Sequence, residues 1–121
     1  MMKRTKRKAR KAAKLMQTAI DKLMTESMGG ADLIAAYLER EGITGLQYRP
    51  AYCPVAQYVK RETGLNVTTD FSASEAWDDH YSQSLAIVLH PQAVSDFVLN
   101  FDTMKYPNLL WRGESSQGPL T

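Results

Sequence analysis

The sequence has little cysteine and no long hydrophobic run. Its 121 residues include one Cys, five Pro and seven Gly. A single Cys cannot form an internal disulfide, and a chain of this length buries enough surface to fold without one. No apolar run approaches the roughly 20 residues that cross a bilayer. The composition therefore excludes a disulfide scaffold, a collagen, a membrane span and wholesale disorder, and it favours one soluble domain.

Motifs for several common chemistries are also absent. The sequence contains no Gly-x-Gly-x-x-Gly, no phosphate-binding P-loop and no Gly-x-Ser-x-Gly. It likewise lacks Cys-x-x-Cys, His-Glu-x-x-His and an EF-hand loop. We therefore expect a protein that is not an enzyme and that holds neither a cofactor nor a metal ion.

The basic residues are distributed unevenly along the chain. Residues 15–121 contain seven basic and thirteen acidic residues, a formal charge of −6. Residues 1–14 contain eight basic residues and no acidic one: Lys3, Arg4, Lys6, Arg7, Lys8, Arg10, Lys11 and Lys14. Such a cluster neutralises phosphates and releases counterions, so it predicts contacts with the backbone of DNA or RNA. No aromatic residue is interleaved, so base stacking is not indicated.

Two alternatives for this basic cluster stay open at this point. It can bind an acidic protein or an anionic membrane surface, or it can be a solvated arm that keeps an acidic domain in solution. It is not the start of a signal peptide, because residues 15–28 are interrupted by polar side chains and lack a small-residue cleavage site. We therefore expect a cytoplasmic protein, with which a single Cys is compatible.

Hydrophobic spacing predicts the first helix. Apolar residues recur at intervals of three and four through Leu15–Met28, which is typical of one face of a helix. We expect this helix to begin near Thr5 and to end at Gly29-Gly30, where glycine accommodates a left-handed backbone. Because the first two turns offer no apolar anchor larger than Ala9, residues 1–14 are expected to be a basic arm or the frayed start of this helix.

Three further helices are expected at residues 32–41, 54–64 and 91–105. The second ends at Gly42 and buries a face that includes Leu33. The third begins with Cys53 as N-cap and Pro54 as its first residue, where the missing N–H has no partner to lose. The last begins at Pro91, buries a face that extends to Met104, and is broken at Tyr106-Pro107.

Between the third and fourth helices the hydrophobic period changes to two. Residues 65–72 alternate apolar and polar side chains and predict a half-exposed strand at a sheet edge. Residues 84–90 are apolar on both faces and predict the better buried strand. The connection, residues 73–83, is long for a hairpin turn and allows a third short strand near Ser74–Trp77.

These elements predict an α+β fold. We expect a small antiparallel sheet of two or three strands covered by four to five helices, in the order ααα-β-(β)-β-α. Residues 15–111 are expected to form a single domain, with Leu109-Leu110-Trp111 packing back on its core. Residues 112–121, rich in Gly, Ser, Gln and Pro, are expected to be a disordered tail.

Two groups of apolar and aromatic residues are candidate partner-binding sites. The apolar stripe of the first helix includes Leu15, Ile20, Leu23 and Met24, and it either joins the core or meets a second copy. Trp77 and Tyr81 lie in a polar connection. Large aromatics at such positions either cover a small core or anchor in the pocket of a partner.

Two further clusters are weaker candidates for chemistry. Cys53 precedes a helix, where the helix dipole lowers a thiol pKa, and His80 or His90 would have to serve as its base. A small buried Cys at a helix start is the commoner situation, so catalysis is the less favoured interpretation. Asp78, Asp79 and His80 carry metal-ligand atoms, but their spacing matches no metal motif, and a solvated acidic loop is the better interpretation.

Three segments resemble a group of small uncharacterised proteins of actinobacteria and their bacteriophages. The shared patterns are Tyr-Leu-(x)n-Gly-Ile-x-Gly at residues 37–45, Cys-Pro-Val-Ala-x-Tyr at 53–58 and Phe-Asp-x-x-x-Tyr-Pro at 101–107. The resemblance covers about residues 31–110. It implies a bacterial or phage context and no catalytic residue, and the basic first helix and residues 77–81 lie outside the shared patterns.

The sequence therefore predicts a small non-enzymatic regulatory or accessory protein of phage or actinobacterial origin. Its basic N-terminal helix is expected to bind the backbone of DNA or RNA. The alternative is a protein-interaction module, either an inhibitor of a host protein or a homodimer formed through the Leu15–Met28 stripe. An enzyme that depends on Cys53 is the third and least favoured possibility.

Overall fold

The computed structural model describes residues 2–112. Within them the elements are α1 (Met2–Ser27), α2 (Ala31–Arg40), η1 (Pro50–Tyr52), α3 (Pro54–Thr63), β1 (Asn66–Thr69), β2 (Ala73–Trp77), β3 (Ser84–Leu89), α4 (Gln92–Asp102) and η2 (Pro107–Leu109). The predicted α+β class and the predicted element order are confirmed. All of the expected C-terminal tail except Arg112 lies outside the described residues.

The sheet is antiparallel, with the strand order β1-β2-β3. Val67 pairs with Ala76 across the first ladder, and Ser74 pairs with Val88 across the second. The third strand expected near Ser74–Trp77 is therefore present as β2, and it is the central one. The prediction that β1 lies at an edge is confirmed.

The prediction that residues 84–90 form the better buried strand is wrong. β3 lies at the other edge of the sheet, and its Ile87 and Leu89 side chains are 59% and 75% exposed. Among residues 2–112, the helices cover only one face of the sheet, so a strand that is apolar on both faces leaves one apolar face exposed. The best buried strand residues are instead Ser74 and Ala76 of β2 and Val67 of β1, which have no exposed surface.

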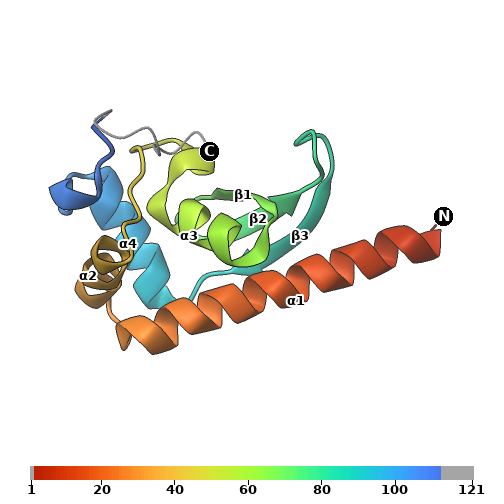
Figure 1. Ribbon diagram of the computed structural model, residues 1–121, viewed down its shortest axis with the longest axis horizontal. Helices are drawn as coiled ribbons and strands as arrows, with labels where there is room; N and C mark the ends of the chain where they lie inside the picture. Colours follow the sequence, from red (N-terminus) through yellow and green to blue (C-terminus); the bar gives the residue numbers. More distant parts are fainter. Residues whose placement is uncertain (1, 113–121) are drawn as a thin grey trace.

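The core lies between the covered face of the sheet and the helices. Figure 1 shows that α3 crosses the sheet and that α1 passes alongside β3. The helices α2 and α4 lie together at one end of the molecule. Met16, Ile20 and Leu23 of α1 are fully buried against this core. Burying each such side chain contributes about 1.5–3 kcal/mol relative to leaving it exposed. The stripe predicted on the first helix thus packs on this chain's own sheet.

The helix ends follow local backbone preferences. Cys53 is the N-cap of α3 and Pro54 is the first residue of the helix. Gly64 is the C-cap, with a φ of 74° in the left-handed region. Both features were predicted. α1 ends at Ser27, one residue before a turn in which Met28, Gly29 and Gly30 all have positive φ. Its first residue is Met2, so residues 2–14 are helical.

Two predicted core positions are instead exposed. Leu33 is 51% exposed because Ile34, Ala35 and Leu38 form the buried side of α2, and Leu33 is turned away from them. Met104 is exposed because α4 ends at Asp102 and the chain turns there, with a φ of 72° at Met104.

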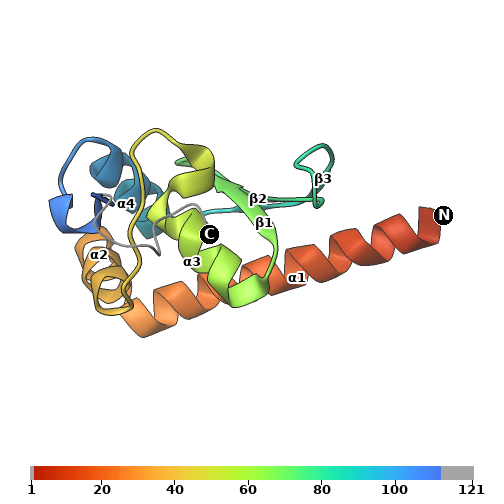
Figure 2. The same ribbon diagram turned by 45° about the horizontal axis from the view of Figure 1, so that its top comes forward.

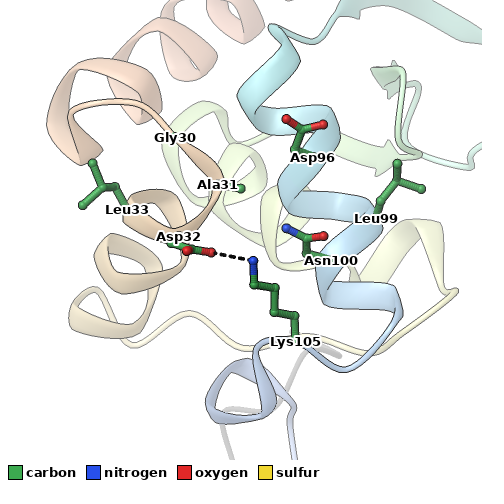
Figure 3. A pocket seen from close by; sticks show the side chains of 8 residues that line it. All are labelled: Gly30, Ala31, Asp32, Leu33, Asp96, Leu99, Asn100 and Lys105. Carbon is green, nitrogen blue, oxygen red and sulfur yellow. Dashed lines mark ion pairs between the residues drawn. The ribbon is translucent and has the colours of Figure 1, made fainter.

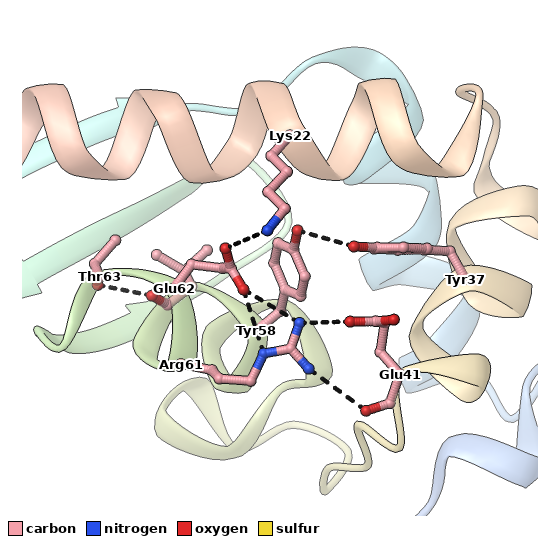
Figure 4. Close-up of polar contacts among 8 residues, drawn as sticks. Lys22, Tyr37, Glu41, Tyr58, Arg61, Glu62 and Thr63 are labelled. Carbon is pink, nitrogen blue, oxygen red and sulfur yellow. Dashed lines mark hydrogen bonds and ion pairs between the residues drawn. The ribbon is translucent and has the colours of Figure 1, made fainter.

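A polar network on the surface joins α1, α2 and α3. Figure 4 shows Arg61 of α3 between two carboxylates, with Glu41 Oε1 2.7 Å and Glu62 Oε2 3.2 Å from its Nη2. Lys22 of α1 donates to Glu62 at 2.8 Å. In the same network the hydroxyls of Tyr37 and Tyr58 lie 3.2 Å apart. The cations of this network are therefore already paired within the fold.

The segment after α4 packs back on the core as predicted. Gly45 N donates to Leu109 O at 2.8 Å, and Trp111 N donates to Gly45 O at 2.9 Å. Leu109 is buried. Gly45 leaves no space for a side chain, because a Cβ there would lie 2.3 Å from Tyr52 O and 2.6 Å from Pro54 Cδ. Glycine is therefore required where these segments meet.

Candidate nucleic-acid interface

The basic half of α1 is the most prominent surface feature of the molecule. Figures 1 and 2 show that the N-terminal end of this helix extends past the rest of the fold. The helix carries the whole predicted cluster: Lys3, Arg4, Lys6, Arg7, Lys8, Arg10, Lys11 and Lys14. Within this cluster, the side chains of the six cations from Lys6 to Lys14 are all exposed. A rigid helix thus holds these cations at a fixed spacing.

Helical geometry places five of these cations in two groups. At 100° per residue, Arg7, Arg10 and Lys14 lie opposite the buried side that Ala12 and Met16 form. We call these three residues the outer ridge. Lys8 and Lys11 lie instead on a flank of the helix that they share with Leu15, at the spacings of three and four that bring side chains together.

The cations of the basic cluster differ from those of the body in their partners. On the body, three of the seven basic residues, Lys22, Arg61 and Lys105, form ion pairs with carboxylates. Among the residues that the structure describes, no cation between Lys6 and Lys14 forms an ion pair. The charge of the six cations from Lys6 to Lys14 is therefore not neutralised within the described part of the fold and is available to an external anion.

A groove of about 540 Å³ lies beside the inner end of the basic cluster. Lys8, Lys11 and Leu15 of α1 line it on one side. The end of α3 and the start of β1 contribute residues 63–66, and the end of β2 and the loop after it contribute residues 77–80. The volume falls in the range of small-ligand sites. The groove joins the basic helix to the Trp77–Tyr81 region, two features that the sequence analysis identified separately.

Asp78 holds the loop between β2 and β3 in shape. Its Oδ1 accepts hydrogen bonds from Ser82 N at 2.8 Å and His80 N at 3.2 Å, and its Oδ2 accepts one from Ser82 Oγ at 2.7 Å. The Ser82 side-chain hydrogen bond is the main reason why the pKa of Asp78 is lowered, to about 2. The Asp78 carboxylate is thus occupied in building the loop.

The partner-binding residues predicted on α1 are largely internal. Ile20 and Leu23 have no exposed surface, so in this structure they offer nothing to a second chain. Leu15 and Met24 are half-buried, and Leu15 lines the groove.

The two predicted loop aromatics have different environments. Trp77 is half-buried and donates from Nε1 to Thr68 Oγ1 at 2.9 Å. Tyr81 is exposed at the tip of the loop, with a φ of 55°.

Cys53 lies in surroundings that suppress thiol chemistry. It is buried, and this burial raises the pKa of the thiol to about 12. A nucleophilic Cys requires a thiolate, which a pKa this high disfavours at neutral pH. His90, one of the two possible bases, is engaged elsewhere, because its Nε2 lies 2.7 Å from Ser74 Oγ. The geometry therefore gives no support to a Cys–His pair.

Metal-ligating groups do not gather in this fold. Within residues 2–112, no three His, Cys, Asp or Glu side chains lie close enough together to hold a metal ion. The acidic loop that includes Asp78 and Asp79 uses the first of these carboxylates for its own turn.

A second hollow, of about 370 Å³, lies between the start of α2 and α4. Figure 3 shows Asp32 and Lys105 pointing toward each other in it, and their charged atoms are 3.3 Å apart. The Asp32 carboxylate also accepts a hydrogen bond of 2.6 Å from Tyr106 Oη, which lowers the pKa of Asp32. Because Lys105, the only cation among its lining residues, is paired with Asp32, this hollow is a weaker candidate for an anionic ligand than the groove beside α1.

The open face of the sheet was not predicted from the sequence. Ile87 and Leu89 point away from the helices, and Phe71 in the turn after β1 is 55% exposed. The signal was the apolar character of residues 84–90 on both faces, which we interpreted as burial on both sides.

No protein-family model, curated protein or solved structure matches the chain. Among residues 2–112, no helix is both long enough and apolar enough to pass through a bilayer.

Proposed function

We propose that this protein is a small non-enzymatic regulatory or accessory protein that binds the backbone of DNA or RNA through the basic half of α1. The observation that carries the proposal is the gathering of exposed cations along one helix, where none of the cations from Lys6 to Lys14 forms an ion pair within the described residues. Unpaired, exposed cations retain the full electrostatic attraction for phosphate and release counterions when they bind it.

The arrangement of the cations supports contact with a backbone rather than with base edges. The outer ridge of Arg7, Arg10 and Lys14 forms a row on the side of α1 that faces away from the body. Phosphate contacts fix the position of a protein on a nucleic acid but carry no sequence information. Binding through this ridge is therefore expected to depend strongly on salt and weakly on sequence.

The test compares two triple variants that remove the same formal charge. The first replaces the outer ridge, Arg7→Gln with Arg10→Gln and Lys14→Gln. The second replaces three exposed arginines of the body that form no ion pair within the described residues, Arg40→Gln with Arg49→Gln and Arg112→Gln. Affinity for a fluorescently labelled DNA duplex is measured by anisotropy.

The ridge variant is expected to lose roughly ten-fold or more in affinity at low salt, since each neutralised phosphate contributes to binding. The body variant is expected to bind nearly as well as the unchanged chain. Equal losses in both variants would mean that only net charge matters, and they would contradict a specific role for α1.

A protein-interaction module is the second candidate function, and the open face of the sheet favours it. Exposed apolar patches at Phe71, Ile87 and Leu89 are typical of surfaces that meet another protein. Light scattering on the unchanged chain and on Leu89→Lys tests this candidate. A dimer that the substitution abolishes supports it, and a monomer in both cases contradicts self-association through this face.

A further inference from the structure

The groove beside α1 combines a cationic side, an apolar lining and an anionic side. The cationic side is formed by Lys8 and Lys11, which are exposed and unpaired with any carboxylate in residues 6–112. These two residues belong to the basic cluster but not to its outer ridge. They therefore place phosphate-binding charge at the edge of a groove rather than on an open surface.

The apolar lining comes from three separate elements. Leu15 of α1, Leu65 before β1 and Leu85 of β3 line the groove, and all three are half-buried. An apolar lining between polar rims favours a flat organic group over a free phosphate ion. The volume of about 540 Å³ is also larger than an inorganic anion needs.

The anionic side presents one carboxylate that is free to bind. Asp79 is exposed, and within the described residues its side chain makes no hydrogen bond or ion pair. Its neighbour Asp78, by contrast, is held by Ser82 and by the backbone of His80. The ordered Asp78 turn therefore fixes the position of Asp79, which lines the groove from the loop after β2, whereas the two lysines line it from α1.

We propose that this groove binds one unpaired nucleotide of a single-stranded DNA or RNA. Its phosphate lies at Lys8 and Lys11, its base lies on the apolar lining, and an amino group of the base donates a hydrogen bond to Asp79. This inference rests on the proposed nucleic-acid binding and specifies the strand state and the base chemistry for it.

The charges across the groove orient the nucleotide. Asp79 repels phosphate, so the backbone follows α1 and the base faces the loop. An ionised carboxylate only accepts hydrogen bonds. Cytosine presents an amino donor at N4, whereas thymine presents an acceptor at O4 in the same place. The groove is therefore expected to prefer cytosine to thymine, and it requires a base that is not held in a duplex stack.

The test uses the full chain and three single strands of about twelve nucleotides, within the range of known single-strand site sizes. They are oligo-dC, oligo-dT and a strand of abasic residues, which carry equal backbone charge. Binding is measured by anisotropy at one salt concentration. Oligo-dC is expected to bind roughly five-fold or more tightly than oligo-dT, and the abasic strand is expected to bind most weakly.

The outcomes separate this inference from the proposed function. Equal affinity for all three strands overturns the nucleotide site while leaving backbone binding in place. No binding to any strand or to a duplex overturns both proposals.

Variants of the groove provide the matched controls. Asp79→Asn is expected to bring the ratio of oligo-dC to oligo-dT affinity close to one, because an amide offers a donor as well as an acceptor. Asp96→Asn makes the same charge change in the hollow between α2 and α4 and is expected to leave the ratio unchanged. A ratio that survives Asp79→Asn would contradict the assigned role of Asp79.

A second pair of variants tests the lysines. Lys8→Gln with Lys11→Gln is expected to lower the ratio as well as the affinity. Arg7→Gln with Arg10→Gln removes equal charge from the outer ridge and is expected to lower the affinity alone. If both pairs changed the ratio of oligo-dC to oligo-dT affinity equally, the groove would not be the site that distinguishes the two bases.

Discussion

His90 joins the sheet to its first turn through a short chain of hydrogen bonds. Its Nε2 lies 2.7 Å from Ser74 Oγ, which in turn lies 2.8 Å from Thr69 Oγ1. Its Nδ1 lies 3.2 Å from Phe71 O, an atom that only accepts, so Nδ1 carries the proton of the neutral ring. Burial lowers the pKa of His90. The neutral ring is thus the form that the fold favours.

This environment predicts a pH dependence of stability. Because the folded pKa of His90 lies below its unfolded value of about 6.5, the unfolded chain takes up a proton first as the pH falls. The stabilisation from the neutral ring is fully present above about pH 6.5 and declines as the pH falls toward the folded pKa. Urea unfolding should show this decline in the unchanged chain and a smaller one in His90→Gln.

The exposed histidine serves as the control for this measurement. His80 lies at the rim of the groove with an exposed side chain, so His80→Gln is expected to keep the full pH dependence. A loss of the dependence in His80→Gln, or its persistence in His90→Gln, would contradict the assignment to His90.

At the scale of elements, α1 has two halves with different tasks. The half from Leu15 onward buries Met16, Ile20 and Leu23 in the core, and the first half carries unpaired charge. A short isolated helix is only marginally stable in water. Packing of the second half of α1 on the core therefore stabilises the helical conformation of the first half. The stability of the core and the presentation of charge are therefore coupled through one helix.

Substitutions along α1 test this division. Leu23→Ala is expected to cost about 2–5 kcal/mol of unfolding free energy, since it removes a fully buried side chain. Leu15→Ala, at the half-buried groove position, is expected to cost clearly less. Urea unfolding measures both. A mild effect at Leu23 together with loss of a dimer in light scattering would mean that the stripe is an interface and not core.

Much of the element order was predictable because local signals were strong. The Cys53-Pro54 start and the Gly64 end of α3 depend on backbone preferences that act within a few residues. The position of β3 in the sheet was not predictable in this way. A strand with apolar residues on both faces is compatible with burial on both sides. Only the tertiary fold shows that Ile87 and Leu89 are left uncovered by the described elements.

At the scale of the whole molecule, the near-neutral net charge conceals two opposed regions. The formal charge of +2 is the sum of a strongly basic helix start and an acidic body. The cluster itself was evident from the sequence, but its lack of ion pairs was not, because that depends on how far the helix extends from the carboxylates of the body. On the body, Lys22, Arg61 and Lys105 form ion pairs with nearby carboxylates.

The groove was equally beyond prediction from sequence. It is lined by four residues of α1, by residues 63–66, by residues 77–80 and by Leu85, which are distant along the chain and meet only when α1 packs along the sheet. The Asp78–Asp79 pair was visible as an acidic loop. The sequence does not show that the Asp78 carboxylate is used within the turn while that of Asp79 is free. This difference is evident only from the hydrogen bonds of the folded chain.

Salt dependence of binding tests the central claim most directly. The affinity of the full chain for a DNA duplex is measured over a range of monovalent salt, and log K is plotted against log salt concentration. With five to eight cations of α1 on phosphates, the slope is expected to be roughly −4 to −7. A slope near zero, or no measurable binding at low salt, would contradict the proposal that α1 binds a nucleic-acid backbone.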